Sequence, residues 1–130
     1  MHGNFNRAET GNFMAAMGPS FRSRFVSQVP ASTADVGVTI AHLLGLKLAK
    51  KGHLIGRVLS ETLNNGANQM PQVKHLTRVS EPASNGLRTV LRYQTVGAQL
   101  YFDAAGFPGR TVGLEPLNSK TNNRVPNDHR

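Results

Sequence analysis

The sequence predicts an α/β fold that ends in a β-hairpin. Three patterns support this prediction: a short apolar run at 13–17, a capped helical pattern at 32–45, and two strand patterns at 87–93 and 99–102. At 130 residues the chain has the length of one ordinary domain and can bury a core. The same length is equally compatible with a part of a larger domain.

The apolar run Phe13–Met17 is bounded by the breakers Gly18 and Pro19. A short run of this kind is typical of a strand that is buried on both faces of a covered sheet. A short helical segment is the alternative, although Pro19 disfavours a helical backbone at Gly18. The preceding residues, His2 to Gly11, are rich in Gly, Asn and Thr and are expected to form a loop.

Residues 32–45 show the clearest helical pattern. Ser32 and Asp35 have the Ser-x-x-Asp spacing of a capping box, which predicts a helix start. Gly45 is a suitable stop, because glycine readily adopts the left-handed backbone at a helix end. Apolar residues recur between these ends at helical spacing, so one face of the helix is apolar: Val36, Ile40, Leu43 and Leu44.

Two strands are predicted in the second half of the chain. Between Leu87 and Tyr93 the residues Leu, Thr, Leu and Tyr alternate with Arg, Val and Arg, which is typical of a half-buried strand. A turn centred on Gly97 leads to Gln99–Phe102, which is expected to pair back as a hairpin. The earlier segment Leu54–Leu63 suits either a short helix or a strand.

The charge of the chain is strongly positive, with 15 Lys and Arg against 7 Asp and Glu and a net charge of +8. Nucleic-acid-binding proteins usually gather cations on one face and interleave aromatic side chains. Here Tyr93 and Phe102 are interpreted as strand core, so we expect a scattered surface charge and do not expect nucleic acid as a partner. A small basic module for nucleic acid or another polyanion is the alternative. The cations occur in three groups: Arg22 and Arg24; Lys47, Lys50 and Lys51; Arg88 and Arg92.

The residues do not compose a complete active site. The chain has no Cys, no Gly-x-Ser-x-Gly elbow and no glycine-rich phosphate loop, and its acidic residues are spread singly. Its five histidines lack metal-ligand spacing. Four of them are expected to have no functional role: His42, His53, His75 and His129. No secretory signal and no apolar run long enough for a membrane span are visible.

Two longer stretches resemble a known family. The first runs from His2 through Thr10 and Phe13–Met17 to Gly18-Pro19-Ser20-Phe21-Arg22, and the second from Ala34 to Leu46. Together they resemble the C-terminal portion of the alkaline phosphatase superfamily, on its type I phosphodiesterase and nucleotide pyrophosphatase side. The segment Thr95 to Gly109 is similar to a C-terminal piece of bacterial members. The resemblance covers most of residues 2–115.

The resemblance implies that residues 1–115 are a C-terminal fragment of an alkaline-phosphatase-like domain, with part of its sheet and helices. Residues 116–130 are then a polar, flexible tail. Family members hydrolyse phosphomonoesters or phosphodiesters with two metal ions, usually zinc, and a Ser or Thr nucleophile. His2 matches the late His-Gly metal ligand of the family, whereas Glu9 and Thr10 match no ligand position.

The remaining metal ligands and the nucleophile come earlier in the family's sequence. A lone imidazole holds zinc poorly, since a catalytic site needs about three protein ligands. We therefore expect no hydrolase activity from this chain alone. The implied partner is the upstream part of the domain or a second copy, because an open strand edge invites association. A structural or interaction remnant without a ligand is the third possibility.

Overall fold

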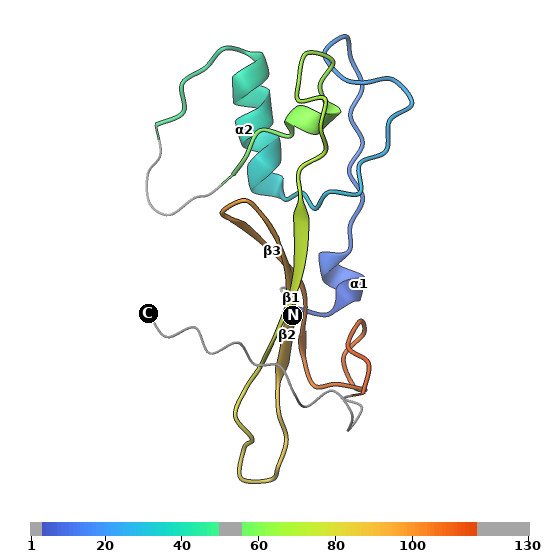
Figure 1. The fold of residues 1–130 in the computed structure, drawn as a ribbon, viewed down its shortest axis with the longest axis vertical. Helices are drawn as coiled ribbons and strands as arrows, with labels where there is room; N and C mark the ends of the chain where they lie inside the picture. Colours follow the sequence, from blue (N-terminus) through green and yellow to red (C-terminus); the bar gives the residue numbers. More distant parts are fainter. Residues whose placement is uncertain (1–3, 50–55, 117–130) are drawn as a thin grey trace.

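The computed structural model describes residues 4–49 and 56–116 (Figure 1). Within these residues a few helices accompany one small antiparallel sheet, so the predicted mixture of helices and strands is confirmed. The elements are α1 (Arg7–Thr10), α2 (Thr33–Leu43), the 3-10 helix η1 (Ser60–Thr62), β1 (Val73–Val79), β2 (Val90–Val96) and β3 (Gln99–Gly106). No helix in this part of the chain is long and apolar enough to cross a membrane. The tail predicted at 116–130 lies, beyond its first residue, outside the described residues.

The three strands form a sheet in which each strand pairs with the next along the chain. Val73 of β1 lies opposite Val96 of β2, which in turn lies opposite Gln99 of β3. The β2–β3 turn contains Gly97 at a φ of 57°, a conformation that glycine adopts without strain. The predicted hairpin is therefore confirmed, although β2 begins at Val90 and not at Leu87.

The face of β2 that packs inward is the opposite of the predicted one. Val90 packs with Ala104 and Leu114, and Val96 packs with Val29 and Tyr101. Val90 belongs to the set that the alternation over Leu87–Tyr93 places on the exposed side, and Val96 lies beyond that pattern. Because β2 carries apolar residues on both faces, a period of two could not by itself decide which face is covered.

Strand β1 lies in a stretch for which the sequence predicts no helix or strand. Six of its seven side chains, all but Val73, are exposed. An edge strand with polar residues on both faces gives no apolar alternation, so the usual signal for a strand is missing here. Its pairing with β2 reveals the strand.

The N-terminal residues cover the outer edge of β3. The Ala105 amide donates to the Phe5 carbonyl at 2.6 Å, and α1 follows directly. The Asn6 side chain caps α1 by accepting from the Ala8 amide at 2.9 Å. The prediction of a loop over His2–Gly11 is therefore wrong at Arg7–Thr10, where this short helix forms.

Helix α2 begins and ends where the sequence predicts. Ser32 is the N-cap, and Asp35 accepts from the Ser32 amide at 2.8 Å in a complete capping box. The helix ends at Leu43, and Gly45 follows in the left-handed region with a φ of 66°. Both predicted helix ends are confirmed. They could be predicted because each depends on contacts between neighbouring residues.

The apolar face of α2 is nevertheless exposed. The opposite, more polar side packs on residues 56–63, where the Leu59 amide donates to the Thr39 hydroxyl at 3.0 Å. Gly56 sits so close to α2 that a Cβ there would lie 2.7 Å from the Ala34 carbonyl oxygen. The exposed apolar residues of the helix and its end are Ile40, Leu43 and Leu44.

The run Phe13–Met17 forms no strand, so the predicted buried strand is wrong in this structure. Phe13 is 92% exposed and Met17 is 94% exposed. No hydrogen bond joins the backbone of this run to any other described residue. In Figure 1 the run lies in the blue segment that leaves α1, away from the sheet. The reason is that residues 4–49 and 56–116 supply no neighbouring strand for it.

Candidate functional site

The predicted metal ligand His2 lies outside the described residues, as do His53 and His129. His42 is exposed near the end of α2, and His75 is exposed on β1. Across residues 4–49 and 56–116, no three His, Cys, Asp or Glu side chains gather as a metal site would require. These residues therefore do not fit a complete zinc centre, which needs about three protein ligands.

Glu9 and Thr10 both serve to hold the N-terminal segment in place. The Glu9 carboxylate accepts from the Asn4 amide at 2.8 Å, and the Thr10 hydroxyl donates to the Asp103 carbonyl. The neighbouring Arg7 binds the Asp103 carboxylate with two hydrogen bonds, at 2.9 and 2.5 Å. The contacts of Arg7 and Thr10 with Asp103 attach α1 to β3.

The guanidinium of Arg7 lowers the pKa of Asp103, first through its hydrogen bonds and also through its charge. Burial of the carboxyl group opposes this effect, while the positive charge of Arg92 adds to it. Since the Arg7 side chain is 49% exposed, solvent weakens the pair, and such pairs contribute about 1 kcal/mol or less.

Acidification is expected to release this ion pair. A carboxyl group with a lowered pKa in the folded chain stabilises it above the unfolded value of about 4, and that contribution is lost as pH falls through the lower value. Asp103→Asn should therefore lower the Tm at pH 7 and make the fall in Tm below pH 4 shallower than in the wild type. Thermal unfolding followed by circular dichroism from pH 2 to 7 measures both effects. Glu81→Gln is the control, and equal acid slopes for wild type and Asp103→Asn would contradict the prediction.

A buried ionic network joins α2, residues 57–61 and β3. The Arg57 side chain donates to both Glu61 carboxylate oxygens, at 2.9 and 2.7 Å, and to the Tyr101 hydroxyl at 2.9 Å. The Arg57 amide donates to Asp35 at 2.8 Å. Burial raises the pKa of Tyr101, and the hydrogen bond from Arg57 partly offsets that rise.

This network joins segments that are far apart in the sequence. No buried side-chain nitrogen or oxygen in the described part of the chain lacks a hydrogen-bond partner. Arg57 and Glu61 were not among the residues predicted from the sequence to have a role. Their spacing of four residues was the one signal available, and it is too common to identify a buried pair.

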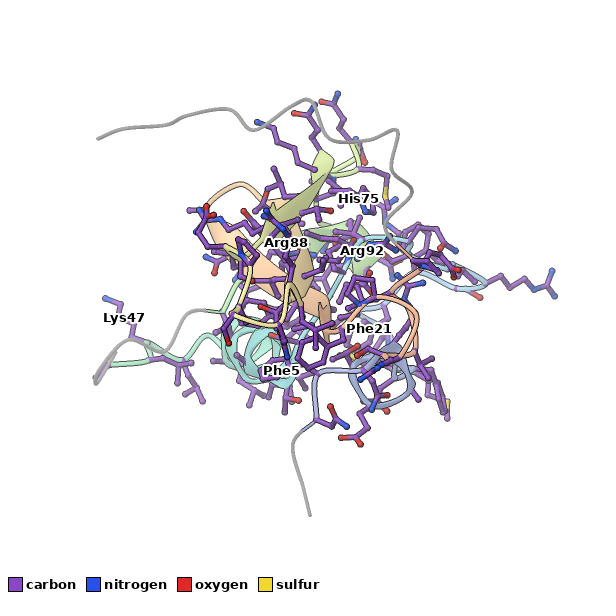
Figure 2. The ribbon with its side chains drawn as sticks, turned by 90° about the horizontal axis from the view of Figure 1, so that it is seen from below. Phe5, Phe21, Lys47, His75, Arg88 and Arg92 are labelled. Carbon is purple, nitrogen blue, oxygen red and sulfur yellow. The ribbon has the colours of Figure 1, made fainter. Side chains whose placement is uncertain are left out.

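One face of the sheet, which we name the open face, is largely exposed. It is made of alternate residues on the three strands, with Phe5 beside it, and the opposite face carries His75 and Arg92, which Figure 2 shows on the same side of the strands. The interpretation of Phe102 as core is wrong, because this side chain is 50% exposed. The open face comprises Lys74, Leu76, Arg78, Leu91, Tyr93, Thr95, Leu100 and Phe102.

The aromatic rings of the open face are held by specific contacts. The Phe5 and Phe102 rings pack edge to face, with centroids 5.7 Å apart and planes at 88°. The Arg78 guanidinium lies over the Tyr93 ring at 5.9 Å from its centroid. At one end of the face, Phe5, Arg78 and Leu91 border a mainly apolar hollow of about 750 Å³ that Glu9 also lines.

The cation groups of the sequence differ in what they contact. Arg22 donates to the carbonyls of Leu63 and Ala67, and Arg92 donates to the Gly113 carbonyl. These arginines stabilise loops through their hydrogen bonds. Lys47, by contrast, points away from the body of the molecule in Figure 2.

Comparisons with known proteins add no relative. No family model, curated protein or solved structure matches the chain. Its function is therefore inferred from its own residues and contacts.

Proposed function

We propose that this chain is the C-terminal part of a metal-dependent phosphohydrolase domain of the alkaline phosphatase type, and that it is inactive alone. The parent activity is hydrolysis of phosphomonoesters or phosphodiesters. The order of the sequence motifs from His2 to Gly109 supports this proposal. It is also supported by α2, which forms within the motif that resembles the family's helix.

The observation that carries the proposal is the exposure of Phe13–Met17. Burying a large apolar side chain is worth about 1.5–3 kcal/mol, so leaving two of them over 90% exposed is unfavourable. In a strand, alternate residues of this run would place apolar side chains on both faces. Such a strand suits the interior of a sheet that is covered by helices on both sides.

Helix α2 presents a second uncovered apolar surface. Its polar side is already packed on residues 56–63, whereas Ile40 and Leu44 are at least half exposed. A partner that adds strands beside Phe13–Met17 and also covers α2 would bury both surfaces. The upstream part of an α/β phosphohydrolase domain has this character.

Within that domain the resemblance assigns His2 as one zinc ligand. The described residues hold no complete metal centre, so we derive no catalytic step from them. The contribution we assign to this chain is one imidazole ligand together with the packing surfaces of Phe13–Met17 and α2.

Co-production with the polypeptide encoded directly upstream tests the proposal. An affinity tag on this chain should retain that polypeptide, and the purified complex should hydrolyse bis-p-nitrophenyl phosphate or p-nitrophenyl phosphate in a zinc-dependent manner. His2→Ala should reduce turnover by about 100-fold, because a catalytic zinc depends on about three protein ligands. His75→Ala is the matched control, since this exposed imidazole on β1 has no assigned role and its loss should leave turnover unchanged.

Three results would count against the proposal. The first is failure of the two polypeptides to co-purify and to show activity. The second is zinc-dependent turnover by this chain alone. The third is an equal loss of activity in His2→Ala and His75→Ala, because that result would reflect general damage and not the loss of a ligand.

A further inference from the structure

The open face presents aromatic rings on neighbouring strands. Tyr93 of β2 lies directly opposite Phe102 of β3, on strands that are about 4.8 Å apart in such a sheet. Phe102 remains half exposed although the edge-on contact with Phe5 steadies its ring. Tyr93 is partly buried. Adjacent rings that solvent can reach on an antiparallel sheet provide surfaces on which successive unpaired bases can stack.

Cations accompany these rings on the same face. Lys74 and Arg78 alternate with His75 and Thr77 along β1, so both belong to the side that carries Tyr93. Both side chains are exposed, and the ion pairs formed among the described residues involve neither of them.

The strands contribute no carboxylate that would compensate this charge. Asp103 is the one acidic residue in β1, β2 and β3, and it lies at the irregularity in the β2–β3 pairing, bound to Arg7. The nearest carboxylate identified beside the open face is Glu9, in the hollow at its end. Lys74 is therefore available to an anionic polymer. Arg78 becomes available when its guanidinium moves from its position over the Tyr93 ring, which also uncovers that ring for a base.

We propose that the open face binds single-stranded nucleic acid, with bases stacked on Tyr93 and Phe102 and phosphates beside Lys74 and Arg78. A duplex does not offer this contact, because its bases are already stacked inside the helix. The net charge of +8 adds a long-range attraction for any nucleic acid, whereas the rings select single strands. This binding does not depend on the proposed hydrolase function and requires neither metal nor a second polypeptide.

Fluorescence anisotropy with a labelled 12-nucleotide oligothymidine and a labelled duplex of equal length tests the inference. We expect the single strand to bind at least about 10-fold more tightly than the duplex at 200 mM salt. Phe102→Leu and Tyr93→Leu preserve apolar bulk but remove the ring, and each should raise Kd about 10-fold, in the range of one lost stacked base. The double variant Lys74→Gln/Arg78→Gln should weaken binding and reduce its salt dependence.

Matched controls separate this surface from the overall charge and from unfolding. Lys47→Gln removes an exposed cation outside the open face, and Phe107→Ala removes an exposed ring outside it, so both should leave Kd unchanged. Thermal unfolding of each variant identifies any loss of fold.

Each of four results would overturn the inference. The first is that duplex and single strand bind with equal affinity, and the second is that Lys47→Gln weakens oligonucleotide binding as much as the double variant does. The third is that both leucine variants keep the wild-type affinity. The fourth is that the oligonucleotide does not bind at 50 mM salt. Heparin binding that is equal in wild type and Phe102→Leu, with no preference for the oligonucleotide, would indicate a general polyanion surface instead.

Discussion

Replacing Glu61 with Gln is expected to lower the free energy of unfolding by about 3 kcal/mol, because it removes one partner of a buried ion pair. Glu61 is 1% exposed and accepts two hydrogen bonds from Arg57. Without the carboxylate, the largely buried Arg57 guanidinium keeps its charge but loses its counter-charge. Glutamine can still accept one hydrogen bond, so the main loss is electrostatic. Urea unfolding followed by circular dichroism gives the free energy directly.

The matched control is Glu115→Gln, an exposed carboxylate near the end of the described chain, which should change stability by about 0.5 kcal/mol or less. A second comparison replaces both partners, as Arg57→Met/Glu61→Met. Because apolar replacement of a whole buried pair is tolerated far better than loss of one charge, the double variant should be more stable than Glu61→Gln. A loss below about 1 kcal/mol in Glu61→Gln would show that this pair does not hold the segments together.

Gly66→Ala is expected to destabilise the chain by about 3 kcal/mol or to prevent folding, through overpacking against fixed backbone. A Cβ at this position would overlap the Ser60 carbonyl oxygen and lie 2.7 Å from the Ser60 carbonyl carbon. It would also lie 3.2 Å from the Leu63 carbonyl oxygen. All three atoms belong to the backbone around η1, so no side chain can rotate away to make room. Urea unfolding of the soluble variant measures the effect.

Gly37→Ala serves as the opposite case. Gly37 lies inside α2 with no atom within 4 Å of the position that its Cβ would occupy. Alanine there restricts the unfolded chain without a clash and should raise the free energy of unfolding by about 0.5–1 kcal/mol. If Gly66→Ala and Gly37→Ala changed the free energy of unfolding in the same direction, the prediction of tight packing at Gly66 around η1 would be contradicted.

The elements that could be predicted from the sequence are those fixed by neighbouring residues. The start of helix α2 is determined by Ser32 and Asp35, which are three residues apart, and its end by Gly45. The hairpin is determined by the turn at Gly97 between two strand-forming segments that are adjacent in the sequence. In both cases the interactions that decide the structure lie within one or two turns of chain.

The features that could not be predicted depend on residues far apart in the sequence. The inward face of β2 is chosen by Leu114 and Val29, which lie on either side of the sheet in sequence. The apolar run Phe13–Met17 predicts a buried strand. Its burial requires neighbouring strands that the described residues do not supply.

The candidate sites could also be predicted only in part from the sequence. The metal ligand that the family resemblance implies is His2. This residue was chosen from a motif of neighbouring residues, and it lies outside the described residues. The open face could not be predicted because Phe102, in the second strand of the predicted hairpin, is interpreted from the sequence as strand core. Its exposure depends on which side of the sheet receives Val29 and Leu114, and no single strand contains that information.

The cover over the outer edge of β3 has a consequence for the order of folding. The three strands pair with their neighbours in sequence, so the sheet can form from contacts that are close along the chain. Docking of α1 through Arg7 and Asp103 must instead close a loop between residues 96 positions apart, at a greater cost in chain entropy. We therefore expect the sheet to assemble early and the N-terminal segment to dock late. During that interval the edge of β3 is free to pair with another chain, so refolding at low protein concentration favours the monomer.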